Sequence, residues 1–313
     1  MSAQRPTPDR PLRIGTRGSK LALAQAYETR DRLMAAHGLP EDAFAITVIK
    51  TTGDAVLDRA LSEIGGKGLF TKEIEEALLA ADIDLAVHSM KDMPTVLPDG
   101  LTLAAYLPRE DVRDAFVSPR HAAIDALPAG TVVGTSSLRR RAQLLHRRPD
   151  LRIVEFRGNV QTRMRKLEEG VAEATFLAVA GLRRLDMAHA IAEMIDPESM
   201  LPAVAQGAIG IETRADDAAT VDLLAPIACA ETATRLAAER AFLAGLDGSC
   251  RTPIGGLALL EDGAIRFRGE IVRPDGSERH ETSRSGPAAD AAAMGADAAA
   301  ELRAKGGEDF FAM

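Results

Sequence analysis

Cationic and hydroxyl side chains stand just beyond five expected strands of this sequence. These residues are Arg17 and Ser19, Lys91, Ser137 with Arg139 and Arg140, Arg157 with Arg163, and Arg184. Ligands of open parallel sheets bind beyond the carboxyl ends of the strands. Arginine pairs with a carboxylate or phosphate through two parallel hydrogen bonds, so several arginines at one edge predict a ligand with several anionic groups. For a single turn, an N-cap or a solvated helix face would explain such residues equally well.

The absence of phosphate-binding motifs indicates which kind of anionic ligand to expect. The chain has neither a GxxxxGK[ST] loop nor a GxGxxG fingerprint, which favours carboxylates over phosphates. In residues 131–166, ten Lys or Arg are opposed only by Asp150 and Glu155. Single-stranded nucleic acid is nevertheless not expected, because its binders add stacking aromatics. This chain has no Trp, two Tyr and a net charge of −8.

Asp92 and Cys250 are the two candidates for reactive groups. Asp92 is the carboxylate that lies among the cationic turns, and nearby positive charge should keep it ionised. An ionised carboxylate there could stabilise a developing cation or accept a proton, although a capping role ahead of Pro94 is the alternative. Packing does not explain Cys250, which lies in a polar loop, whereas Cys229 reads as a small apolar residue. No HxxxH or CxxC spacing is present, so no metal site is expected.

The segment Gly65–Phe70 is rich in glycine and contains Lys67. It could be a lid that brings one more cation over the ligand, or a plain loop.

Alternating strands and helices are the elements that must position these residues. Two runs of them predict two mainly parallel sheets with helices on both faces. The first run has strands at Leu12–Thr16, Phe44–Thr51 and Ile83–His88 and helices at Ser19–His37 and Thr71–Ala80. The second has strands at Thr131–Gly134, Leu151–Phe156 and Thr175–Ala180 and helices at Ser137–His146, Val160–Glu169 and Leu182–Leu185. Extended segments are also expected at Leu103–Tyr106 and Ala115–Ser118.

The C-terminal part predicts a small α+β domain. Helices at Glu231–Leu246 and Ala288–Lys305 flank a hairpin of Ile265–Val272 and Ser277–Ser283, with its turn at Pro274–Gly276. Proline-containing joints near 107–111 and 200–204 suggest three domains. These are residues 1–107 with 208–226, an inserted domain at 113–201, and 230–313.

Composition points to an ordinary globular protein of the cytoplasm. Of 313 residues, 46% are apolar and 27% charged, and the two cysteines are too few for a disulfide framework. The first residues, Met1 to Arg13, lack the apolar run of a signal peptide, and no stretch approaches the roughly 18 apolar residues of a membrane span.

The motifs resemble those of the hydroxymethylbilane synthase, or porphobilinogen deaminase, family of tetrapyrrole and heme biosynthesis. The similar segments run in the family's order from about residue 13 to 255. They are Arg13–Ser19, Gly65–Phe70, Val87–Asp92, Gly134–Arg140, Arg157–Val160, Leu177–Leu182, Leu201–Gly207 and the loop around Cys250. The HSMKD and GTSSLRR segments are highly specific. Ser249 departs from the pattern, since many members have glycine there.

The resemblance implies a fold and a reaction. It implies two doubly wound lobes like those of periplasmic binding proteins, followed by a small domain that carries the cysteine. The implied enzyme is a monomeric transferase that joins four porphobilinogen molecules head to tail with release of ammonia. Hydrolysis then frees the linear tetrapyrrole hydroxymethylbilane. The implied cofactor is a dipyrromethane, covalently bound through Cys250.

The resemblance also assigns roles to residues. Lys91, Asp92, Ser137, Arg139 and Arg140 would hold the cofactor. Arg17, Ser19, Arg157, Arg163 and Arg184 would hold the substrate and the growing chain, and Asp92 would be catalytic. Each porphobilinogen carries two carboxylates, which agrees with the arginines inferred from the turns alone.

Two other classes of protein share some of these features. A non-catalytic, two-lobed polycarboxylate-binding protein would need the arginines but neither Asp92 nor Cys250. An RNA-binding protein would use the basic segment 131–166, and its affinity would fall steeply with salt.

Overall fold

The computed structural model describes residues 5–55, 70–248, 252–307 and 309–311. They form two compact units. The first holds the described residues up to Glu110 together with Ala208–Ala233, and the second holds Asp111–Gly207 and the described residues from Thr234 onward.

The first unit is built on a five-stranded sheet with the strand order β2-β1-β3-β10-β4. The strands are β1 (Leu12–Arg17), β2 (Phe44–Ile49), β3 (Leu85–Ser89), β4 (Leu101–Tyr106) and β10 (Ile209–Arg214). β1 is parallel to β2 and β3, whereas β10 is antiparallel to both of its neighbours. The helices are α1 (Lys20–His37), the short α2 (Thr52–Ala55), α3 (Lys72–Leu79) and α7 (Ala218–Leu224).

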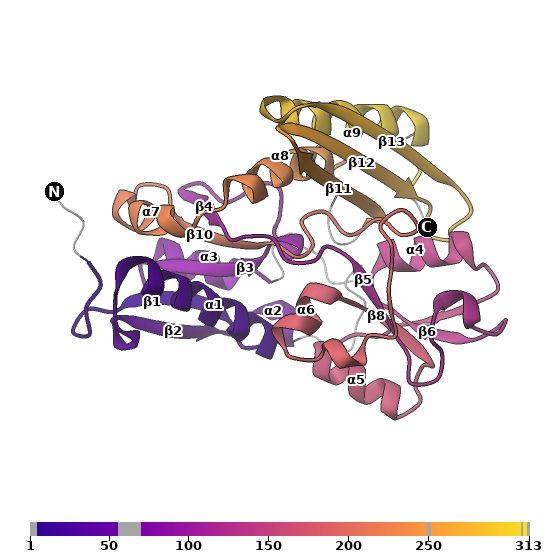
Figure 1. The fold of residues 1–313 in the computed structure, drawn as a ribbon, viewed down its shortest axis with the longest axis horizontal. Coiled ribbons are helices and arrows are strands. Elements are labelled where there is room, and N and C mark those ends of the chain that lie inside the picture. The colour runs from indigo at the N-terminus through magenta and orange to yellow at the C-terminus, as the bar shows by residue number, and fades with distance from the viewer. Residues whose placement is uncertain (1–4, 56–69, 249–251, 308, 312–313) are drawn as a thin grey trace. The chain divides into compact units, whose positions relative to one another are not determined.

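Helices cover both faces of this sheet (Figure 1). Leu85 and Val87 of β3 join the core under α1, while Ala86 between them joins Ile74 and Leu78 of α3. Successive strand residues point to opposite faces, so a run buried throughout needs a helix on each side.

The second unit contains a sheet of the same design, with the strand order β7-β6-β8-β5-β9. Its strands are β5 (Asp114–Val117), β6 (Val132–Gly134), β7 (Arg152–Val154), β8 (Ala174–Ala178) and β9 (Glu193–Met194). Its helices are α4 (Leu138–Arg147), α5 (Val160–Glu168) and α6 (Val179–Arg184). As in the first sheet, three parallel strands are followed by an antiparallel one, here β5.

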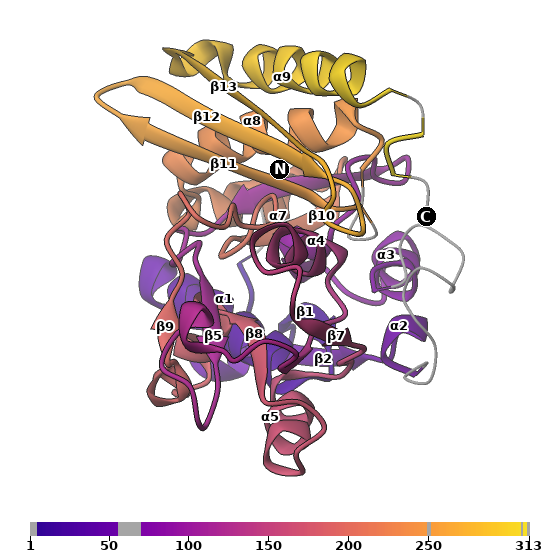
Figure 2. The same ribbon diagram turned by 90° about the vertical axis from the view of Figure 1, so that its right-hand side faces the viewer.

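The same unit also contains a three-stranded antiparallel sheet. It consists of β11 (Ile254–Glu261), β12 (Ala264–Val272) and β13 (Arg279–Pro287), with helices α8 (Ala230–Gly245) and α9 (Ala291–Gly306). Figure 2 shows α9 running along these strands. A Cβ on Gly295 of α9 would lie 2.0 Å from the carbonyl oxygen of Ala238, so only glycine lets α9 approach α8 this closely. Phe242 of α8 packs against Gly269 of β12, which places both helices on one face of the sheet.

The predicted fold class is confirmed: two α/β sheet domains and a small C-terminal α+β domain. The sequence prediction omitted β9, β10, β11, α2 and α7. It also extended the strand at 175–180 too far, because the chain turns into α6 at Val179, at the edge of the sheet.

Glu75 of α3 allows a test of how the first unit responds to pH. Its side chain is buried, and burial raises its pKa, as does the neighbouring Glu212, while Thr71 and His88 act in the opposite direction. A raised pKa means that the stability contributed by protonated Glu75 is present at low pH and lost as the pH rises through that pKa. We therefore measure thermal unfolding between about pH 4 and 8. The melting temperature of Glu75→Gln should rise relative to that of the wild type as the pH increases.

Glu76→Gln is the matched control, because Glu76 is an exposed glutamate on the same helix. A difference between Glu75→Gln and wild type that stays flat with pH would contradict the assignment.

Candidate functional site

A small pocket of about 80 Å3 lies at the carboxyl ends of β1 and β3 in the first unit. Its polar lining residues are Arg17, Ser19, Gln25, Thr71, His88, Ser89, Lys91 and Asp92. Among the described residues that line it, Asp92 is the only carboxylate. The structure thus brings together four of the predicted site residues: Arg17, Ser19, Lys91 and Asp92.

Asp92 is held next to Arg17 but keeps contact with solvent. It ends a short 3-10 turn, Met90–Asp92, directly after β3. Its carboxylate lies 3.9 Å from Nη1 of Arg17, and its side chain is 31% exposed. The Arg17 guanidinium lies 4.2 Å from the centre of the Phe70 ring, a cation–π contact that restrains it. Asp92 is therefore ion-paired yet reachable by a ligand.

Gln25 and Ser89 belong to the same pocket and were not among the predicted site residues. Gln25 Nε2 donates to Ser89 Oγ at 2.9 Å, and Ser89 Oγ donates to Gln25 Oε1 at 3.0 Å. The sequence signal that could have identified Gln25 is its polar side chain in the first turns of α1, six positions after Ser19. Ser19 itself accepts from the backbone N–H of Ala22 and so begins α1 at the pocket edge.

The predicted residues of the second unit start at the amino end of α4. Ser137 is the N-cap, and its Oγ accepts from the backbone N–H of Arg140 at 3.4 Å. The side chains of Arg139 and Arg140 are each only 5% exposed, which differs from the solvated face that arginines on a helix usually form. Both guanidinium groups are held by Asp114, the first residue of β5.

Asp114 is the centre of a buried hydrogen-bond network. Its Oδ2 accepts from Arg139 Nη2 at 2.7 Å, and its Oδ1 accepts from Arg140 Nη2 at 2.6 Å and from Gln206 Nε2 at 3.0 Å. Two backbone carbonyls complete the network. Arg139 Nη1 donates to the carbonyl of Leu201, and Arg140 Nη1 donates to that of Phe176.

The charge balance of this network favours an ionised carboxylate. Burial alone would raise the pKa of Asp114, but the guanidinium groups of Arg139 and Arg140 overcome it and hold the pKa well below its ordinary value. Burial lowers the pKa of Arg139, and the carboxylate of Asp114 opposes that change. Sequence reasoning missed Asp114 because it leads an apolar strand and its partners lie 25 and 26 positions away.

The remaining predicted cations also belong to the second unit. Arg157 follows β7 and is nearly buried, and its Nη1 has no hydrogen-bond partner among the described residues. Arg163 donates to the carbonyl of Gly158, and Arg184 donates to that of Gly207. An orphaned, buried guanidinium nitrogen is suited to an anionic ligand. The predicted residues Lys67 and Cys250 lie outside the described part of the chain.

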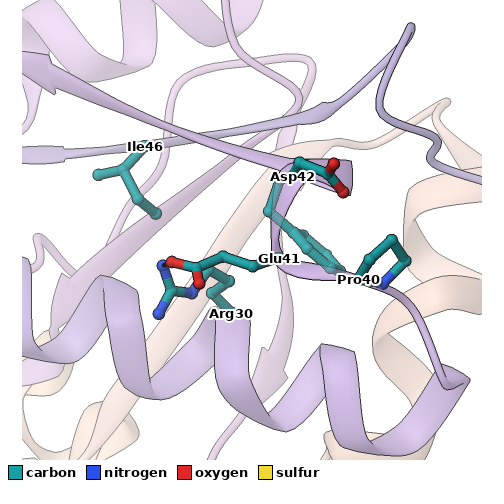
Figure 3. Close-up of a pocket in the computed structure, with 6 residues that line it drawn as sticks. Arg30, Pro40, Glu41, Asp42 and Ile46 are labelled. Atoms are coloured by element: carbon teal, nitrogen blue, oxygen red, sulfur yellow. Dashed lines mark hydrogen bonds and ion pairs between the residues drawn. The ribbon is translucent and has the colours of Figure 1, made fainter.

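A second hollow, of about 540 Å3, is lined by none of the predicted residues. Figure 3 shows it between α1 and the segment that leads into β2, with Arg30 beside Glu41. These two side chains form an ion pair at 2.5 Å. Arg30, the cation of this hollow, is already paired with Glu41, so we assign no ligand to the hollow.

The described residues show neither a metal centre nor a membrane span. No group of three or more His, Cys, Asp or Glu side chains there is arranged to hold a metal ion. No described helix combines the length and hydropathy that a membrane crossing requires.

Together these features define an α/β protein of two similar lobes, with cationic turns at the strand ends and a small additional α+β domain. Residues 12–222 match the family model described as porphobilinogen deaminase, dipyromethane cofactor binding domain, and residues 233–304 match that of its C-terminal domain. The chain belongs to the porphobilinogen deaminase family and is a transferase. The predicted family is thereby confirmed.

Individual relatives agree with this assignment. The porphobilinogen deaminase of Paracoccus denitrificans is 69% identical over 98% of both chains. That of Nitrobacter hamburgensis is 58% identical over 96% of this chain and 95% of its own.

Solved structures that resemble the chain include binding proteins. The methionine binding protein MetQ has a TM-score of 0.43 and 14% identity, covering 70% of this chain and 89% of its own. An ABC transporter periplasmic substrate-binding protein from Coxiella burnetii has a TM-score of 0.43 and 12% identity, covering 71% and 94%.

The Asp114 network can be tested by removing its charge. Asp114→Asn leaves two buried guanidinium groups without their carboxylate, which typically costs about 3–5 kcal/mol. We expect urea unfolding at neutral pH to show a loss of this order. In the wild type, the lowered pKa means that this stability is present above the ordinary pKa of aspartate, about 3.9, and is lost as the pH falls below it.

Asp125→Asn serves as the control, because Asp125 pairs with Arg147 at the surface and is 69% exposed. If both variants lost the same free energy of unfolding, the buried network would stabilise the protein no more than a surface ion pair does.

Proposed function

We propose that this chain joins four porphobilinogen molecules head to tail into hydroxymethylbilane, releasing one ammonia for each unit added. Each addition breaks the bond between the aminomethyl carbon and its nitrogen. A new carbon–carbon bond then forms to the free pyrrole carbon of the growing chain, and that carbon loses its proton. Water finally releases the linear product. The proposal includes a cytoplasmic monomer that needs neither nucleic acid nor a membrane.

The observation that carries this proposal is the position of Asp92. It is the carboxylate of a cation-lined pocket, 3.9 Å from Arg17 and partly exposed. Departure of ammonia leaves positive charge on the substrate carbon, which a fixed carboxylate stabilises. The same carboxylate can accept the proton released when the new bond has formed. A protein that only binds polycarboxylates needs no acid in that place.

The cationic side chains have the chemistry to hold the substrate and the product chain. Every pyrrole unit brings an acetate and a propionate, so the anionic charge grows with each addition. We propose that Arg17, Ser19, Arg157, Arg163 and Arg184 hold these carboxylates. The orphaned Nη1 of buried Arg157 supports this role, and Lys67 is proposed to add a cation from a lid loop.

The cofactor is proposed to be a dipyrromethane bound covalently through Cys250. When bound, it would supply the free pyrrole carbon to which the first substrate is joined. Lys91, Asp92, Ser137, Arg139 and Arg140 are proposed to hold it. Lys91 and Asp92 line the pocket, and Ser137 begins the helix on which both arginines lie. We also propose three domains: residues 1–107 with 208–226, 113–201 and 230–313.

The intact mass of the purified, denatured protein tests the covalent primer. We expect an excess equal to two linked pyrroles in the wild type and none in Cys250→Ser, because only the thioether survives denaturation. If a fresh wild-type preparation shows no excess, porphobilinogen is added and the mass measured again. A protein that still gains nothing is a binding protein, and the proposed reaction is then wrong.

Asp92→Asn tests the catalytic role of Asp92 separately from the attachment of the primer. The variant should keep the primer mass but lose turnover by roughly 10²-fold or more, the order expected when a group that moves protons is removed. The measurement is the steady-state rate of tetrapyrrole formation. Asp82→Asn is the matched control, since Asp82 is an exposed residue just before the other end of β3. Turnover of Asp92→Asn near the wild-type rate would remove Asp92 from its proposed role.

A further inference from the structure

The buried network of the second unit carries more positive than negative charge around Asp114. Two guanidinium groups share that one carboxylate, and both are almost entirely buried. Nε of Arg139 also has no hydrogen-bond partner among the described residues. Buried charges and buried polar atoms are rarely left uncompensated. A second anion near Arg139 is therefore needed.

Glu270 of β12 is a fully buried carboxylate in the same unit. Its Oε2 accepts from Nε of Arg279 on β13 at 2.8 Å. Its Oε1 has no hydrogen-bond partner within the described chain. Arg139 Nε and Glu270 Oε1 are thus both buried and both lack a hydrogen-bond partner among the described residues.

The pleat of β12 directs Glu270 away from the helices of its own sheet. Phe267 and Gly269 contact Phe242 of α8, so Glu270 points to the opposite face. Helix α4 also packs against β12. At His146 of α4, the ring Nδ1 lies 2.8 Å from the carbonyl oxygen of Gly276 in the β12–β13 turn.

Leu201 lies near both residues. A Cβ on Gly255 would lie 2.8 Å from Glu270 Oε1 and 2.8 Å from Leu201 Cβ, so both groups border the space that glycine leaves open there. The carbonyl of Leu201 accepts from Nη1 of Arg139 at 2.7 Å. Arg139 and Glu270 therefore both lie in the vicinity of this one residue.

Their mutual influence is visible in the electrostatics. Burial raises the pKa of Glu270, while Arg279 and then Arg139 oppose the rise. Burial lowers the pKa of Arg139, and both Asp114 and Glu270 oppose that change. Each group therefore favours the charged form of the other.

We propose that Glu270 is a positioning residue for Arg139: a second buried counter-ion that fixes this guanidinium from the C-terminal sheet while Asp114 fixes it from β5. This inference rests on the proposed function, in which Arg139 holds the primer. With two anchors on different elements, Arg139 keeps one orientation before the primer binds, so less ordering is needed on binding. The C-terminal sheet would then contribute to primer capture.

The first test compares Glu270→Gln with Glu261→Gln in the full chain. Glu261 lies on β11 of the same sheet and pairs with Arg266, but its side chain is 60% exposed. Primer-free protein is given porphobilinogen, and primer loading is followed by intact mass. We expect Glu270→Gln to load about ten times more slowly, the order seen when a group that orients a binding side chain is removed. Glu261→Gln should load like the wild type, and wild-type loading by Glu270→Gln would overturn the proposal.

The second test asks whether Glu270 acts through Arg139. Glu270→Gln is combined with Arg139→Lys, which keeps the charge but loses the guanidinium fork. If Glu270 acts by orienting that fork, Glu270→Gln should change loading little in the Arg139→Lys background. A merely structural effect would lower loading by the same factor in both backgrounds, and that result would overturn the proposal.

A further variant covers the case in which Glu270→Gln folds poorly. Glu270→Leu/Arg279→Leu removes both partners of the ion pair, of which Glu270 is buried and Arg279 is 25% exposed. Replacing a buried ion pair by apolar residues is often neutral for stability. Slow loading by this double variant would support the proposal, and wild-type loading would overturn it.

Failure of the proposed function gives a different result. In that case the wild type itself acquires no primer. The coupling is then measured from the urea unfolding of the wild type, Glu270→Gln, Arg139→Lys and their combination. Non-additive midpoints would support the pairing of Glu270 with Arg139, and additive midpoints would overturn it.

Discussion

The second unit depends on the burial of two adjacent arginines. Arg139 and Arg140 could not enter the interior without an anion, because removing a charge from water is costly unless it is paired. Asp114 supplies that anion from β5, and the carbonyls of Phe176 and Leu201 each accept one further hydrogen bond from the arginines. The network therefore ties α4 to β5, to β8 and to the segment that follows β9, so all of them must fold together.

Asp114 and Asp92 differ in burial, and this difference distinguishes the structural carboxylate from the one proposed to act in catalysis. Asp114 is fully buried, is held by two guanidinium groups, and has a pKa well below its ordinary value. Such an acid resists protonation and cannot readily exchange protons with a substrate. Asp92 makes a longer contact, 3.9 Å, with one arginine and is 31% exposed. Both residues stand at strand ends near cations, and only the structure distinguishes their roles.

The sequence predicted the elements whose signals are local. Helices α1, α4 and α5 begin after Ser19, Ser137 and Asn159, and each of these caps accepts a backbone hydrogen bond in the structure. β10 was missed because its place in the sheet is set by distant partners. Glu212 of β10 contacts His88 of β3 across 124 positions. The burial of Arg139 was missed for the same reason, since no residue near it in sequence reveals Asp114. The motifs around Cys250 and Lys67 identified the family, but both residues lie beyond what the structure describes.

The two five-stranded sheets share more than their strand order. In each, the antiparallel strand carries a fully buried acid: Glu212 on β10 and Asp114 on β5. Glu212 Oε2 lies 3.0 Å from His88 Nε2, directly before the Ser89–Asp92 turn. Asp114 binds the two arginines in the first turn of α4. A buried acid needs a fixed partner, so each one holds in place the strand or helix end from which site residues project. The antiparallel strand thus places a buried acid next to residues of the candidate site in both sheets.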